Sequence, residues 1–144
     1  LGKYDIPAQL MEVEVTESVD LEGSSEAMAE ILQLRAAGVS IALDDFGTGH
    51  SSLSYLQQLP LDIVKIDQSF VRRIQPAEGP GNSILRAIIA LAKALHLEII
   101  AEGVETEEQH NWLAAEGCDI AQGYLHGKPV DRLEFEQRYL RQSA

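Results

Sequence analysis

The stretch Ile41-Ala-Leu-Asp-Asp-Phe-Gly-Thr-Gly-His-Ser-Ser52 sets two aspartates side by side directly after an apolar run and follows them at once with glycines. The apolar run is typical of a buried strand, and the glycines allow the backbone to bend sharply after it. Two carboxylates held this close repel each other, and removal from water raises the cost of their charges. A positive charge should therefore lie beside Asp44 and Asp45.

The rest of the chain alternates strand-like with helix-like segments. Period-two alternation or short apolar runs predict strands over residues 10–16, 40–45, 63–67, 98–101 and about 119–123. Capping residues and apolar stripes predict helices over residues 24–37, from 51 or 52 to 58, from 82 or 83 to 95, 107–117 and 131–140. Because each return to the same edge of a sheet requires a crossover, this order indicates parallel βα units, α/β in class. Residues 75–81 are the only candidate flexible segment, so the chain is one domain or part of one.

Composition limits the function classes. A chain of 144 residues that is 45% apolar falls in the range of one soluble globular domain. The net charge of -12 opposes binding to a long nucleic acid, and a phosphate substrate would need metal ions to bring it in. The single Cys118 excludes an internal disulfide, and no apolar run approaches the roughly 20 residues of a membrane span. These features favour a reducing compartment, and we expect a cytoplasmic location.

Polar residues fall at or just beyond the carboxyl ends of the expected strands. They are Glu14, Asp44, Asp45, Lys65, Asp67, Glu102, Glu105 and Gln122. In a β/α barrel these ends form the rim that carries the active site. Alternation also places Lys65 and Asp67 on one face of their strand, with Val64 and Ile66 facing the outer helices. A lysine that points into a barrel requires carboxylates around it.

Each of these residues also has an ordinary explanation. Glu12 and Glu14 could form the exposed face of an edge strand, and the aspartates before Gly47 could be turn residues. Lys65 could be an exposed strand lysine, which is the commoner case. Carboxylates at the ends of four or five strands are unlike a random scatter of solvated side chains. Together they favour a metal-binding rim.

Five motifs occur in order along the chain. They are EVTES (14–18), DDFGTG (44–49), KIDQSF (65–70), AEGVET (101–106) and QGYL (122–125) followed by KP (128–129). The set resembles the EAL-type cyclic di-GMP phosphodiesterases. The resemblance implies a variant (β/α)8 barrel of the TIM type that hydrolyses cyclic di-GMP to linear pGpG with two divalent cations, Mg2+ or Mn2+.

The resemblance leaves part of that family's domain unmatched. The glutamate of the EAL motif itself and an asparagine ligand belong to the first three strands of the family, and nothing in this sequence corresponds to them. A full barrel takes about 250 residues. Residues 1–144 are therefore expected to be the C-terminal part of a single barrel domain, an incomplete barrel of about five βα units. Its upstream strands, and any sensor or GGDEF-type cyclase domain, would lie outside the sequence.

The resemblance also implies roles for the rim residues. Glu14 and Asp44 would be metal ligands, Asp45 the carboxylate between the two ions, and Glu102 a further ligand. Lys65 would hold the attacking water or stabilise charge on the phosphate. Asp67, Glu105 and Gln122 would support the site. Asp45, Lys65 and Glu102 are thus the expected catalytic residues.

A loop after the two aspartates completes the implied site. Phe46, Gly47, Thr48 and Gly49 resemble the family's regulatory loop, which Glu17 is expected to anchor and which couples dimer contact to metal occupancy. The expected partners are cyclic di-GMP and a second copy, as a homodimer or a domain-swapped assembly.

Three functions fit the sequence to different degrees. The first is a fragment of a metal-dependent cyclic di-GMP phosphodiesterase, inactive alone. The second is a non-catalytic EAL-like domain that binds cyclic di-GMP or a protein partner as a regulator. The third is an unrelated barrel enzyme that uses Lys65 as a base beside a carbonyl, which the motif set disfavours.

Overall fold

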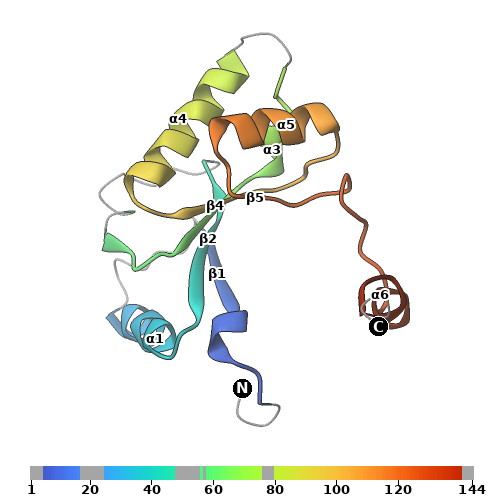
Figure 1. Cartoon of the computed structure of the whole chain (residues 1–144). Helices are drawn as coiled ribbons and strands as arrows, with labels where there is room; N and C mark the ends of the chain where they lie inside the picture. Colours follow the sequence, from blue (N-terminus) through green and yellow to red (C-terminus); the bar gives the residue numbers. More distant parts are fainter. Residues whose placement is uncertain (1–4, 17–24, 48–55, 57, 76–79, 141–144) are drawn as a thin grey trace.

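The protein is built on a five-stranded parallel sheet with the strand order β1-β2-β3-β4-β5 (Figure 1). The computed structural model describes residues 5–16, 25–47, 56, 58–75 and 80–140. The strands are β1 (Glu12–Thr16), β2 (Ser40–Phe46), β3 (Ile63–Ile66), β4 (Glu98–Ala101) and β5 (Ile120–Ala121). Within the described residues, β1 pairs with β2 alone and β5 with β4 alone, so the sheet does not close. The expected class, an α/β fold of consecutive βα units with an open barrel sheet, is confirmed.

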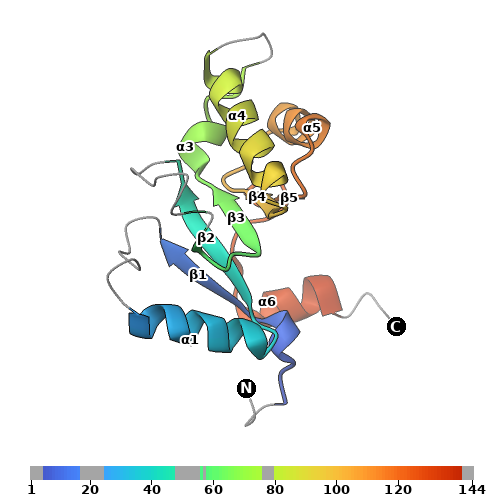
Figure 2. The same ribbon diagram turned by 90° about the vertical axis from the view of Figure 1, so that its left-hand side faces the viewer.

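Helices follow the strands. They are α1 (Ser25–Ala36), α3 (Gln68–Val71), α4 (Pro80–Ala94), α5 (Glu107–Glu116) and α6 (Arg132–Phe135), with a 3-10 turn η1 (Ala8–Leu10) before β1 and a π-helical turn η2 (Glu136–Leu140) after α6. Figures 1 and 2 show α1 beside β1 and β2, while α4 and α5 lie together near β4. None of the helices in these ranges is long and apolar enough to cross a membrane.

The two faces of the sheet bury different sets of residues. Ile41, Leu43, Val64 and Ile66 pack with helix residues such as Leu85, Ile89 and Leu113 in the main core. A small second cluster on the opposite face contains Ala42, Ile63 and Ile100. Since side chains alternate along a strand, Lys65 shares the face of this small cluster. The expected division, Val64 and Ile66 outward and Lys65 inward, is therefore what the structure has.

Several element boundaries differ from those expected. The first strand begins at Glu12, because the chain forms the short η1 turn immediately after Pro7. Helix α4 begins at Pro80, two residues before the earliest expected start, as suits a proline in a first helical turn. The four-residue helix α3 was not expected, and it starts where the Asp67 side chain accepts a hydrogen bond from Ser69 N. Most of the helix expected over residues 51–58 lies outside the described residues.

Candidate active site

The candidate site is a group of carboxylates around one buried lysine. Lys65 is only 6% exposed. Its Nζ lies 2.8 Å from Glu102 Oε1 and 3.8 Å from Asp44 Oδ1. It also forms a hydrogen-bonded ion pair with Glu14 Oε1. Four consecutive strands thus each bring one charged group to the same point.

Strand register explains why these groups meet. Glu14 pairs with Ala42, and Lys65 pairs with Ile100. Ala42 and Ile100 face inward, so Glu14 and Lys65 face inward beside them. Asp44 follows Ala42 by two residues and Glu102 follows Ile100 by two, which returns both to the inward face. The parallel direction of the strands then collects the charges at the carboxyl end of the sheet.

The Lys65 ammonium stays charged because of its neighbours. Burial alone would lower the pKa of Lys65, but the hydrogen bonds that its ammonium donates to Glu102 and Glu14, with the charges of Glu102 and Asp44, raise the pKa by more. The pKa of Lys65 therefore lies well above its ordinary value. A lysine that acts as a general base needs the opposite shift.

An irregularity in β2 coincides with the second aspartate. In a regular strand, Asp44 and Asp45 would point to opposite faces. Pairing of β2 with β3 shifts register between Leu43 and Phe46, and Asp45 has a left-handed φ of 56°. Bulges of this kind redirect a side chain beside a site. The charges of Lys65 and Glu14 act on Asp45 as well as that of Asp44, so its carboxylate lies within electrostatic range of the cluster.

The charge of Asp44 raises the pKa of Asp45 above its ordinary value, with a smaller contribution from burial. Because the folded pKa exceeds the unfolded one, ionisation of Asp45 lowers stability as the pH rises through that interval. We expect Asp44→Asn to return the pKa of Asp45 toward its ordinary value, which a carbon NMR titration of the carboxyl groups in metal-free protein would show. The matched control is Glu98→Gln, at the opposite end of the sheet. An unchanged Asp45 pKa in Asp44→Asn would contradict this account.

The loops after β4 and β5 are locked to each other. Gln122 N donates to Ala101 O (2.9 Å), and its carbonyl accepts from Val104 N (3.0 Å). A Cβ on Gly123 would lie 2.1 Å from Val104 O, so only glycine fits this approach. Beside these loops lies a cavity of about 250 Å³. Its lining includes Gln68, Arg72, Glu102, Glu105, Gln122 and Tyr124.

The remaining expected site residues have other surroundings. Asp67 caps α3, because its carboxylate accepts a hydrogen bond from Ser69 N at 2.9 Å. Glu105 is exposed and pairs with Arg72 at 3.7 Å. Phe46 ends β2 and packs in the main core, and Gly47 has a left-handed φ of 95°. Glu17, Thr48 and Gly49 lie outside the described residues.

The cluster offers oxygen donors. Carboxylate oxygens are the ligands that hard divalent cations prefer in proteins. Within the described residues, no three acidic, histidine or cysteine side chains are already arranged to hold a metal ion. The Lys65 ammonium instead is the cation on which Glu14, Asp44 and Glu102 converge. The donor chemistry therefore fits a divalent cation, while the spacing is that of carboxylates gathered on lysine.

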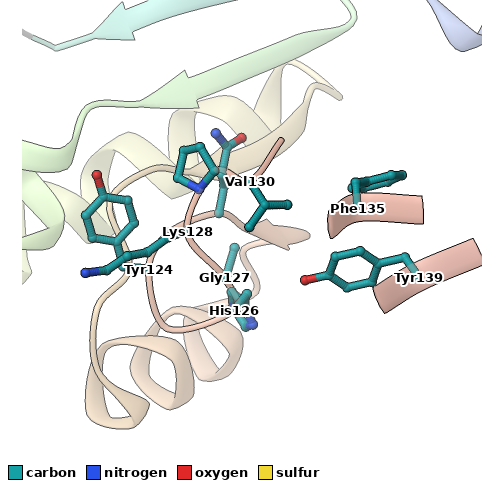
Figure 3. A pocket seen from close by; sticks show the side chains of 11 residues that line it. Tyr124, His126, Gly127, Lys128, Val130, Phe135 and Tyr139 are labelled. Atoms are coloured by element: carbon teal, nitrogen blue, oxygen red, sulfur yellow. The ribbon is translucent and has the colours of Figure 1, made fainter. Parts of the chain in front are cut away.

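A second, larger hollow of about 610 Å³ lies between the segment after β5 and the C-terminal turns. Figure 3 shows Phe135 and Tyr139 on one side of it and Tyr124 and Lys128 on the other. The Lys128 ammonium lies 5.3 Å from the centre of the Tyr124 ring. This hollow shares Gln122 and Tyr124 with the smaller cavity beside Glu102.

Sequence reasoning missed several residues near the site. Arg72, Gln68 and Tyr124 line the smaller cavity without belonging to an expected site position. Gln109 was missed as well, although it forms a capping box with Thr106 at the start of α5. The spacing Thr-x-x-Gln at residues 106–109 is the signal that could have indicated the cap.

The family of the chain follows from comparison with known proteins. The EAL domain profile matches residues 1–129. With a parallel sheet, a carboxylate-ringed lysine and this match, the chain belongs to the EAL domain family.

Named relatives support the same assignment. The chain is 43% identical over 137 residues to the cyclic di-GMP phosphodiesterase NbdA of Pseudomonas aeruginosa, covering 95% of this chain and 17% of NbdA. The structure matches a phosphodiesterase complex of PaMucR with c-di-GMP at a TM-score of 0.84 and 39% identity, covering 94% of this chain and 54% of the other. It also matches a manganese and cyclic di-GMP complex of Klebsiella pneumoniae BlrP1 at a TM-score of 0.74 and 33% identity, covering 87% and 32%. The chain thus spans less than a fifth of NbdA and about half of the PaMucR chain.

Proposed function

We propose that the protein containing this chain is a metal-dependent phosphodiesterase that hydrolyses cyclic di-GMP to linear pGpG. The observation that carries the proposal is the meeting of Glu14, Asp44 and Glu102 around Lys65 at the carboxyl end of the sheet. Family membership and the named relatives support the same activity. This chain would contribute part of the site.

The metal ions belong to the proposal. Glu14, Asp44, Asp45 and Glu102 would hold two divalent cations, Mg2+ or Mn2+, since all four offer oxygen ligands. Bound cations of this kind lower the pKa of water and stabilise charge on a phosphate. The repulsion between Asp44 and Asp45, visible in the raised pKa of Asp45, is what cations between them would remove.

Lys65 has a separate role in the proposal. An ammonium whose pKa lies well above its ordinary value remains protonated at neutral pH and can donate hydrogen bonds. Lys65 would therefore orient the attacking water or stabilise charge on the phosphate. The same shift weighs against an enzyme that uses Lys65 as a base beside a carbonyl.

The domain boundaries are also proposed. Residues 1–144 would be the C-terminal part of one EAL barrel, with further strands and a sensor or GGDEF-type domain upstream. A relative described as a bifunctional diguanylate cyclase and phosphodiesterase, MucR of Pseudomonas aeruginosa, is consistent with that arrangement. A cytoplasmic location rests on the composition, with one cysteine and no candidate for an internal disulfide.

The 144-residue chain alone should self-associate. The edges β1 and β5 each pair on one side only in the described residues, and such edges recruit another chain. Leu10, Leu133 and Leu140 are 76%, 69% and 62% exposed. Light scattering on the isolated chain should give a mass above 15.8 kDa, consistent with a homodimer or a swapped assembly. A monodisperse monomer would contradict this expectation.

Metal dependence tests the proposed activity. The protein containing this chain is incubated with cyclic di-GMP and with Mg2+, Mn2+ or a chelator, and the linear product is measured. We expect turnover with Mg2+ or Mn2+ and none with the chelator. Binding of cyclic di-GMP without turnover under any metal condition would show a regulatory binding domain instead.

A further inference from the structure

Gln109, in the first turn of α5, uses both ends of its side-chain amide. Its Oε1 accepts hydrogen bonds from Glu105 N (2.8 Å) and Thr106 N (3.1 Å). Its Nε2 donates to Val71 O (3.4 Å). The bond from Thr106 N belongs to the capping box that begins α5, whereas the bonds to Glu105 N and Val71 O are not needed for that cap. Gln109 therefore does something besides starting a helix.

The bond to Val71 joins two segments that carry site residues. Val71 is the buried last residue of α3, which follows β3 and Lys65 almost directly. The segment bound by Gln109 Oε1 leads back to Glu102 at the end of β4. Lys65 Nζ and Glu102 Oε1 are themselves 2.8 Å apart. Gln109 thus links the segments that follow these two charged residues.

Two other described contacts join the loop after β4 to α3. A Cβ on Gly103 would lie 2.5 Å from Gln68 Cβ, so the loop packs closely against the start of α3. The ion pair between Arg72 and Glu105 is 3.7 Å long, with side chains 60% and 48% exposed. Exposed ion pairs of this kind contribute little to stability. The bond from Gln109 to Val71 is partly buried and is the better shielded polar link.

We propose that Gln109 is a positioning residue for the site: through Val71 it fixes the segment from Gly103 to Thr106 against α3. Together with the backbone hydrogen bond from Glu102 N to Ile66 O (3.0 Å), it would hold Glu102 in place beside Lys65. This inference rests on the proposed function for its link to turnover. Misplacement of a reacting group by about 1 Å can lower a rate by about 100-fold. Loss of the bond from Gln109 to Val71 should therefore lower the rate of hydrolysis, although Gln109 does not contact the substrate.

Two substitutions separate the cap from the link. Gln109→Glu keeps acceptor oxygens for Glu105 N and Thr106 N, and glutamate is accepted at this position of a capping box. It removes the donor to Val71 O. Gln109→Ala removes the cap and the link together. The control for the added charge is Asn111→Asp, on an exposed position of the same helix.

The measurements are steady-state kinetics on cyclic di-GMP and amide hydrogen exchange, both on the complete protein that contains this chain. For Gln109→Glu we expect kcat to fall about 10-fold or more with KM within about twofold, since the effect lies in the placement of reacting groups. Exchange at residues 68–74 should quicken about 10-fold while residues 105 and 106 keep their protection. Asn111→Asp should match the wild type in both.

Gln109→Glu with wild-type kcat and wild-type exchange at residues 68–74 would overturn the inference and leave Gln109 as a cap alone. If Gln109→Ala does not fold, the comparison of Gln109→Glu with the wild type still tests the inference. A wild-type protein that never hydrolyses cyclic di-GMP would contradict the proposed function. In that case the exchange result by itself decides whether Gln109 holds the two segments together.

Discussion

Replacing Asp45 by Asn should abolish hydrolysis of cyclic di-GMP in the protein containing this chain, with kcat lower by about 1,000-fold or more. The proposal places Asp45 between two cations, and several kcal/mol of transition-state stabilisation depend on holding such ions. Asn keeps the shape of the side chain but lacks the negative charge. Turnover with saturating Mg2+ or Mn2+ is the measurement.

The fold should survive this change. Asp45 is exposed and has a left-handed φ of 56°, a conformation that Asn adopts more readily than most residues. Removal of its charge also relieves the repulsion by Asp44 that raises its pKa. Thermal unfolding of metal-free Asp45→Asn should therefore match or exceed the wild type. The control Glu98→Gln removes one carboxylate at the other end of the sheet and should retain activity, whereas full activity in Asp45→Asn would contradict the assignment.

Replacing Lys65 by Ala should lower kcat by about 100- to 1,000-fold and change KM by only a few-fold. A donor that stabilises charge developing in the reaction acts mainly in the transition state, and loss of one such donor costs about this much. A raised KM with unchanged kcat would indicate simple substrate contact.

The same substitution should also destabilise the metal-free protein. Without the ammonium, Glu14, Asp44 and Glu102 face one another with no counter-charge. We expect a loss of about 1–3 kcal/mol, below the full cost for a buried pair because the carboxylates are partly solvated. Denaturant unfolding at neutral pH measures it. Lys93→Ala, which removes an exposed lysine bonded to Glu116 O, is the matched control.

Much of the fold could be predicted because it depends on local patterns. Alternation along β1 and the apolar runs of β2, β3 and β4 predicted the strands, and their alternation with helices indicated that they run parallel. The period of two along β3 placed Lys65 on the face opposite Val64 and Ile66. The position of polar residues at strand ends was enough to expect carboxylates near Lys65. These inferences use period and order alone.

Other features depend on contacts that sequence patterns do not reveal. Helix α3 has four residues, too few for a period of 3.6 to show. The left-handed backbone of Asp45 arises where β2 and β3 lose register. The bond from Gln109 to Val71 joins residues 38 positions apart. The spacing Thr-x-x-Gln could have indicated the capping box of Gln109, but no local pattern indicates its bond to Val71.

The most direct test is the product formed from cyclic di-GMP in water enriched in oxygen-18 with Mn2+ present. We expect linear pGpG with one oxygen-18 atom on its terminal phosphate, because water attacks one phosphodiester and the ring opens. We also expect this product to be absent in Asp45→Asn. Recovery of intact cyclic di-GMP from the wild-type protein, bound or free, would contradict the central claim.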